Sequence, residues 1–344
     1  MNTVQHTCQL LPGSRHARPY AVLDLPGTHE WQRPKPCSLG SFRTDILEGL
    51  FAPQKRIDSK YLYDARGSEI FEEICDVPEY YPARAETRLL ADFSAAIAAR
   101  LPSNARLIEL GSGASAKTRL LLDEAAHITH YTAIDISQDA LDRACASLVA
   151  AYPGLEIRPR MRDFSVPGAL QGSSPGFGSL LFLPGSTLGN FAPDVAGKLM
   201  SGWADECGDG ALFLVGMDLV KDIATLVRAY DDADGVTARF NLNLLARLNR
   251  ELDASFDLET FEHRAVWNAQ LSRIEMHLVS LRDQFVDVAG ARLRFGRMET
   301  IHTESSYKYR AEEFVALAES SGWALEECRI SEGPEFGLFL FRRR

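Results

Sequence analysis

The chain has 344 residues, 46% of them hydrophobic and 24% charged, and its formal net charge is −10. No apolar run approaches the roughly 20 residues that span a bilayer, so we do not expect an integral membrane protein. Because phosphate binding draws mainly on Lys and Arg, the negative charge argues against a nucleic-acid partner.

The cysteines are scattered along the chain without a CxxC pair, at Cys8, Cys37, Cys75, Cys145, Cys207 and Cys328. This spacing favours reduced thiols over a disulfide framework or a zinc site. The N-terminus has no continuous apolar segment followed by a small-residue cleavage site, so it does not resemble a secretory signal. We therefore expect a cytoplasmic protein.

Residues 1–40 are rich in Pro, Gly, His and Arg and show no sustained periodicity, which predicts a poorly ordered extension. Residues 41–101 are helical in character, and their last helix ends before Pro102. Strands and helices then alternate as far as residue 216. The predicted strands are 106–110, 131–134, 155–161, 179–183 and 211–216, and the predicted helices are 118–125, 138–151 and 194–207. This alternation is typical of a parallel sheet with helices on both faces.

The alternation stops after residue 216. An amphipathic helix is predicted from Phe240 to Leu252, and antiparallel strands are predicted at 274–281 and 292–295. A helix at 311–320 and strands at 323–330 and 337–341 close the chain. We therefore expect two lobes, a core of 86–220 plus 309–344 and a discontinuous α+β lobe of 41–85 plus 221–308.

A glycine-rich turn follows the first predicted strand, in the segment ELGSGAS at 109–115. Glycines there let the backbone turn sharply and pass close to a ligand. Asp135 lies 24 residues beyond Gly111, at the end of the second strand, where a carboxylate can accept hydrogen bonds from the ribose of an adenosine group. Asp163 and Phe164 follow the third strand, where an acid can meet an adenine amino group while the ring stacks on the base.

The same turn also satisfies GxGxxA, so a nicotinamide-dependent dehydrogenase must be considered, as must a tight turn without a ligand. Glu109 at the end of the strand is awkward beside a pyrophosphate but suits the cationic methionine portion of S-adenosylmethionine. The Asp163-Phe164 pair fits an adenine pocket. These features favour an α/β fold with a Rossmann-like class I methyltransferase sheet, which binds S-adenosylmethionine.

Several longer segments resemble the histidine Nα-methyltransferases of ergothioneine biosynthesis, and the likeness covers residues 41–341. The segments are YDARGS (63–68), PEYYPARAE (78–86), ELGSGASAKTRLLL (109–122), GSTLGNF (185–191), 218–235, 240–261, IEMHL (274–278) and TESSYKYR (303–310). The resemblance implies a monomeric enzyme that transfers three methyl groups from S-adenosylmethionine to the α-amine of L-histidine, giving hercynine.

The resemblance also implies roles for individual residues. It implies cofactor binding by Gly111, Lys117, Asp135, Asp163 and Phe164. It implies histidine binding by Tyr80, Asn190, Tyr230, Met276, Glu304 and Ser306, with Tyr63 and Asn190 at the reacting amine. Tyr80 is preferred to Tyr81 because it keeps the spacing from Tyr63. Pro184, before the Asn190 turn, departs from the family pattern.

Three alternatives remain open. The chain could methylate the amine of another amino acid or of a secondary-metabolite intermediate, or it could be a ligand-binding relative without activity.

The acidic run at 231–234 could suggest a metal, but it lacks the EF-hand spacing and has no histidine neighbours. We interpret this run as a solvated turn and expect no metal site.

Overall fold

The structure, a computed structural model, describes residues 39–344 except 114, 174, 177 and 334. The expected extension at 1–40 lies outside the described residues, apart from Leu39 and Gly40. These two residues begin helix α1 (Leu39–Phe51).

A seven-stranded sheet forms the larger part of the fold, in the order β11-β12-β5-β4-β1-β2-β3. Its strands are β1 (Ala105–Leu110), β2 (Ile128–Asp135), β3 (Glu156–Met161), β4 (Ser179–Leu183), β5 (Leu212–Asp218), β11 (Trp323–Ile330) and β12 (Phe336–Arg343). Strands β1 to β5 pair in parallel, whereas β12 is antiparallel to both β5 and β11. The predicted strands of the core and their parallel pairing are confirmed. They were recognisable because strands that are buried on both faces, such as β4, have near-continuous apolar sequences.

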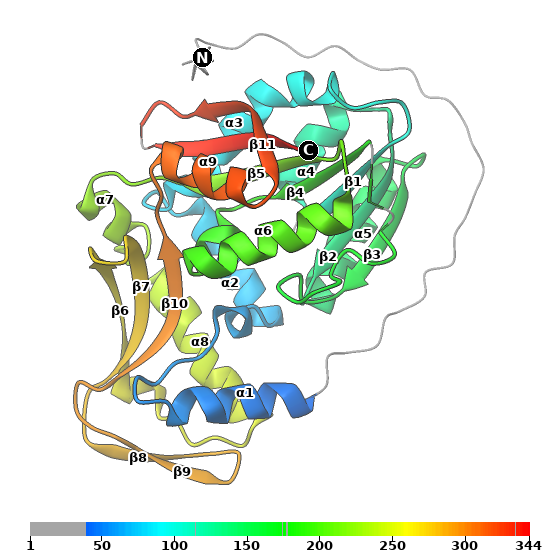
Figure 1. The fold of residues 1–344 in the computed structure, drawn as a ribbon. Coiled ribbons are helices and arrows are strands. Elements are labelled where there is room, and N and C mark those ends of the chain that lie inside the picture. The colour runs from blue at the N-terminus through cyan, green and yellow to red at the C-terminus, as the bar shows by residue number, and fades with distance from the viewer. Residues whose placement is uncertain (1–38, 114, 174, 177, 334) are drawn as a thin grey trace.

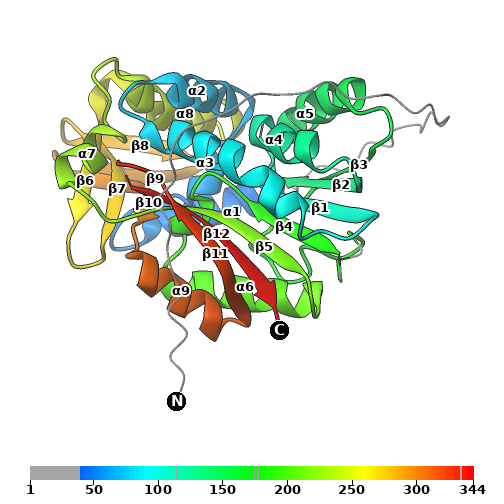
Figure 2. The same cartoon turned by 90° about the horizontal axis from the view of Figure 1, so that it is seen from above.

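Helices cover both faces of this sheet (Figure 2). One face carries α3 (Tyr81–Ala98), α4 (Ala116–Glu124) and α5 (Gln138–Ala151), and the other carries α6 (Pro193–Cys207) and α9 (Ala311–Ser320). The expected Rossmann-like class I methyltransferase fold is therefore confirmed.

The remaining elements lie together beside the carboxyl ends of the parallel strands (Figure 1). They are η1 (Ser59–Leu62), α2 (Ala65–Asp76), α7 (Ile223–Arg228), α8 (Val236–Glu251), η3 (Leu258–Thr260), a sheet of β6 (Phe261–Asn268), β7 (Arg273–Ser280) and β10 (Thr300–Tyr307), and a hairpin of β8 (Gln284–Val288) and β9 (Ala291–Phe295). The sequence predicted β7 and β9 but not β6, β8 or β10. Polar residues interrupt the apolar pattern of β6 and β10, so their sequences alone do not indicate strands.

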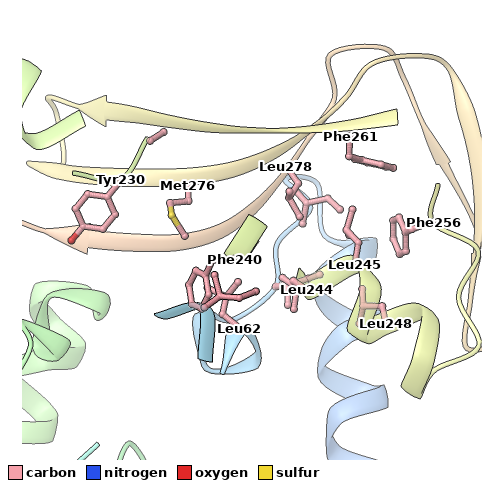
Figure 3. Packing of buried hydrophobic residues seen from close by; sticks show 14 of the residues in the cluster. Leu62, Tyr230, Phe240, Leu244, Leu245, Leu248, Phe256, Phe261, Met276 and Leu278 are labelled. Atoms are coloured by element: carbon pink, nitrogen blue, oxygen red, sulfur yellow. The ribbon is translucent and has the colours of Figure 1, made fainter. Parts of the chain in front are cut away.

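The apolar core of this smaller part is built by α8 and the three-stranded sheet. Met276 of β7 points toward Phe240 of α8, and Leu244 and Leu248 continue the same helix face (Figure 3). This buried cluster draws its members from 42–81 and 226–301, whereas two other clusters draw theirs from 85–219 and 307–341. On this basis we propose the two-lobe division at 41–85 plus 221–308 and 86–220 plus 309–344.

Candidate active site

A cavity of about 570 Å³ lies between the carboxyl ends of the parallel strands and the smaller lobe. Its wall includes every residue to which the sequence assigned a site role. These are Tyr63, Tyr80, Gly111, Lys117, Asp135, Asp163, Phe164, Asn190, Tyr230, Met276, Glu304 and Ser306. Residues from both lobes thus face one space.

The glycine turn after β1 forms one end of the cavity. Gly111 and Gly113 have φ values of +70° and +48°, a backbone region that side chains with a Cβ rarely adopt. The Gly113 N–H donates to Asp135 Oδ2 at 3.1 Å, and the Ser137 N–H donates to Asp135 Oδ1 at 2.9 Å. Burial raises the pKa of Asp135 despite these bonds. Asp135 therefore ties the turn to the end of β2.

Ser112 in the same turn provides a test of whether the residues fit a cofactor. Its hydroxyl oxygen is buried and has no hydrogen-bond partner among the described residues. Buried polar atoms in native proteins nearly always have a partner. An orphaned hydroxyl beside open glycines and a carboxylate therefore fits a polar ligand such as an adenosyl amino acid.

Glu109 at the end of β1 also lines the cavity. Thr118 donates to its Oε2 at 2.6 Å, and the Tyr131 hydroxyl donates to the same oxygen. Burial raises the pKa of Glu109 to about 7, although both hydrogen bonds act in the opposite direction. The Glu109 carboxyl is therefore held rigidly near the turn.

Lys117 in the first turn of α4 forms an ion pair with Glu86 of α3. Glu86 is fully buried, and its two oxygens also accept from the Gly185 N–H at 3.0 and 2.8 Å. The ion pair of Lys117 and Glu86 therefore connects the helix after the glycine turn to the loop that follows β4. Sequence reasoning missed Glu86, although a charged residue among the apolar residues of a helix is a signal that could have found it.

Replacing Gly216 of β5 with alanine should destabilise the fold through Glu86. A Cβ at Gly216 would lie 1.9 Å from Glu86 Oε1, so the buried pair must shift. We expect a loss of about 1–3 kcal/mol in the free energy of unfolding, measured by urea denaturation. The control is Gly202→Ala on the exposed side of α6, where a Cβ meets no atom within 4 Å. Equal effects of the two substitutions would contradict the strained contact.

Asp163 and Phe164 lie beyond the end of β3. The Ser165 N–H donates to Asp163 Oδ1 at 2.9 Å, and Lys60 of the smaller lobe lies 3.4 Å from Asp163 Oδ2. The Phe164 ring packs against Phe191 with a centroid distance of 6.2 Å. Sequence reasoning missed Lys60, because no pattern shows that this residue crosses to the other lobe.

The turn after β4 carries Asn190, at the end of η2 (Thr187–Asn190). A Cβ at Gly189 would lie 2.9 Å from the Tyr307 carbonyl, so glycine lets this turn approach β10 closely. The Pro184 carbonyl accepts a hydrogen bond from the Thr187 hydroxyl at 2.7 Å, which closes the start of this turn.

Glu304 of β10 lines the same cavity as Asn190. Glu304 is 9% exposed, and burial raises its pKa to about 7 while Lys308 and Asn190 act in the opposite direction. Asn190 and Glu304 come from different lobes. They bring a neutral amide and a titratable acid to one cavity.

The tyrosine doublet before α3 divides between two environments. Tyr80 lines the cavity, whereas the Tyr81 hydroxyl donates to the buried Asp218 at 2.8 Å. Tyr230 also lines the cavity, and its hydroxyl lies 2.8 Å from Ser306 Oγ. Sequence reasoning missed Asp218 and Lys308, the buried ion pair behind Tyr230.

No group of His, Cys, Asp and Glu among the described residues could hold a metal ion.

The interpretation of 231–234 as a solvated turn was wrong for Asp232. Asp232 is buried and accepts from the N–H groups of Val236 and Thr237 at 2.8 and 2.7 Å, which caps α8. In the described part of the chain, no helix is long and apolar enough to cross a membrane.

Known proteins resemble the chain over nearly the whole described range. A family model described as histidine-specific methyltransferase, SAM-dependent, matches residues 42–343. A histidine N-alpha-methyltransferase of Mycolicibacterium smegmatis is 42% identical, over 87% of this chain and 94% of that protein. One of Mycobacterium tuberculosis is 38% identical, over the same shares. Ergothioneine biosynthesis protein 1 of Neurospora crassa is 30% identical, over 88% of this chain and 35% of that protein.

The fold, the glycine turn with Asp135 and the family match agree. The chain belongs to the histidine-specific, S-adenosylmethionine-dependent methyltransferase family, and it is an S-adenosylmethionine-dependent methyltransferase.

Proposed function

We propose that this enzyme transfers three methyl groups to the α-amine of L-histidine and forms hercynine for ergothioneine biosynthesis. The single observation that carries the proposal is that Asn190 and Glu304 line the same cavity as the glycine turn. This arrangement offers partners for an amine and for an imidazole beside the cofactor residues. Two relatives named histidine N-alpha-methyltransferase support it.

For the cofactor, we assign the ribose to Asp135 and the adenine to Asp163 and Phe164. Lys117, held by Glu86, is placed to bind the carboxylate of the methionine portion, and Gly111 lets the backbone approach it. When bound, S-adenosylmethionine supplies an electrophilic methyl group on a sulfonium.

For the substrate, we assign the imidazole to Glu304 and Ser306, with Met276 packing against the ring. Tyr80 and Tyr230 then form the remaining wall around the amino acid backbone. Asn190 and Tyr63 are assigned to the amine. An amide oxygen accepts an N–H without placing a full charge beside the sulfonium.

The chemical step needs a neutral amine in line with the methyl group and the sulfur. Alignment of this kind can contribute as much as roughly 7–11 kcal/mol. Burial raises the pKa of Tyr63 well above its ordinary value, so its hydroxyl is neutral and serves as a hydrogen-bond partner rather than a base. An α-amino group has a pKa of about 8 in peptides, so binding of the neutral amine, with its proton released to water, is sufficient.

The test is mass spectrometry of L-histidine incubated with the purified protein and S-adenosylmethionine. Successive methyl additions that stop at three are the expected result. L-tryptophan and L-tyrosine serve as comparison substrates, because a 26% identical relative is named an L-tryptophan methyltransferase. Methylation of either in preference to histidine would overturn the substrate assignment but not the enzyme class.

Histidine affinity should depend on the protonation of Glu304. Since burial raises its pKa to about 7, the carboxylate that accepts the imidazole N–H predominates above that pH and is lost below it. We expect the affinity to fall by up to about tenfold per pH unit below 7. Calorimetric titration of the S-adenosylhomocysteine complex measures this.

The control for this pH dependence is Glu304→Gln, which cannot titrate at this position. The free ring of histidine also titrates, near pH 6.5, and this effect remains in the variant. The expected result is therefore that the wild type shows the Glu304 step in addition to the ring step, whereas the variant shows the ring step alone. Identical profiles would show that Glu304 does not contact the ring.

We also propose that the enzyme is a cytoplasmic monomer without nucleic-acid partners. Its net charge of −10 and its scattered cysteines support this proposal. Light scattering during size-exclusion chromatography tests the monomer.

A further inference from the structure

Lys308 directly follows β10 and is fully buried behind Tyr230 and Ser306, which form the cavity wall. Its Nζ lies 2.8 Å from Asp218 Oδ2, 2.9 Å from the Tyr230 hydroxyl oxygen and 2.9 Å from Ser306 Oγ. A lysine ammonium has three N–H donors and no acceptor. All three donors are therefore used, one on the anion and one on each cavity hydroxyl.

Asp218 holds this ammonium in place from the other side. It is fully buried and accepts from both the Tyr81 hydroxyl and the Lys221 ammonium. The Asp218 backbone N–H also lies 3.0 Å from the Ser186 hydroxyl, which anchors it to the turn that carries Asn190. Lys308 thus has one fixed position relative to the cavity.

The Tyr230 and Ser306 hydroxyl oxygens are 2.8 Å apart, so one must donate to the other. A phenol is a stronger acid than an aliphatic alcohol and is the better donor of the two. The Lys308 ammonium lies 2.9 Å from both oxygens and favours neither direction, so the greater acidity of the phenol decides. Tyr230 therefore donates to Ser306.

A serine oxygen has two acceptor positions and one proton. Lys308 and Tyr230 occupy both acceptor positions of Ser306, so its own O–H remains as a donor toward the cavity. Glu304, two residues earlier on the same strand, lies on the same wall and offers an acceptor. The cavity wall then has a hydrogen-bond acceptor at Glu304 next to a hydrogen-bond donor at Ser306.

We infer that Lys308 is a positioning residue that makes Ser306 a donor only, so that the cavity selects a ring with one N–H and one unprotonated nitrogen. The inference rests on the proposed function. Neutral imidazole has this pair of groups, whereas imidazolium has two donors and indole has a single N–H. Either of these rings leaves the Ser306 proton without a partner, which penalises binding.

The test is a double-mutant cycle on histidine binding to the S-adenosylhomocysteine complex, measured by calorimetry. Lys308→Met and Ser306→Ala should each weaken histidine binding roughly 10- to 100-fold, and the double variant should bind no more weakly than Ser306→Ala alone. Lys308→Met should also narrow the preference for histidine over tryptophan. Affinity for S-adenosylhomocysteine should stay unchanged.

Additive losses in the cycle would overturn the inference, as would an equal loss of affinity for S-adenosylhomocysteine, because a merely structural lysine would affect both ligands. Should Lys308→Met unfold the chain, Tyr230→Phe tests the same relay, since it keeps the ring but removes the hydroxyl that donates to Ser306 and accepts from Lys308. Its effect should likewise vanish in the Ser306→Ala background. A wild type that binds no histidine would overturn the proposed function as well, whereas a histidine-binding wild type with an additive cycle overturns this inference alone.

Discussion

Replacing Glu304 with alanine is expected to weaken L-histidine binding roughly 100-fold, because the imidazole N–H loses a charged acceptor in a buried site. Affinity for S-adenosylhomocysteine should change by no more than about twofold, since the assigned cofactor residues are held by other contacts. Calorimetric titration of each ligand measures both effects. The turnover number should fall too, because the imidazole loses the partner that orients the substrate in the cavity.

The matched control is Glu304→Gln, which keeps the size of the side chain and one acceptor oxygen. The histidine affinity of Glu304→Gln should lie between those of the wild type and of Glu304→Ala. Equal losses for histidine and S-adenosylhomocysteine would remove Glu304 from the substrate pocket. They would indicate that the substitution disturbs the whole cavity.

Asp135→Ala should have the reverse selectivity. We expect S-adenosylhomocysteine binding to weaken on the order of 100-fold, since both ribose hydroxyls lose their acceptor and the glycine turn loses the bond from the Gly113 N–H. Fluorescence or calorimetric titration with S-adenosylhomocysteine measures the loss.

Asp139→Ala controls for the change in charge. Asp139 is exposed in the first turn of α5, four residues beyond Asp135, and its replacement removes the same charge. This control should leave affinity for S-adenosylhomocysteine unaltered. Unchanged affinity in Asp135→Ala itself would rule out the ribose assignment.

An element can be predicted from the sequence when its side chains point into an apolar core, because it then has a recognisable apolar pattern. The strands of the large sheet are apolar throughout, as in β4 and β5, because helices cover both faces. Strand β10 carries Thr303, Glu304 and Ser306 toward the cavity instead, so its function removes the apolar alternation by which a strand is recognised.

The site divides in a similar way. Residues in recognisable segments, such as Asp135 and Asn190, could be named before their surroundings were known. Lys60 and Lys308 could not, because each acts through a partner more than 30 positions away in the chain. No local spacing encodes such a pair.

The sequence by itself determined the methyltransferase sheet, the glycine turn and the expected family, because these depend on local patterns of apolar residues, glycines and motif order. Only the tertiary structure decided that Asn190 and Glu304 line one cavity, that the Tyr81 hydroxyl bonds to the buried Asp218, and that Asp232 caps α8. It also brought Lys308 against Asp218, Tyr230 and Ser306. The physical reason is that burial and hydrogen-bond partners depend on which distant segments pack together, and those contacts decide which groups are charged, which donate and which can meet a substrate.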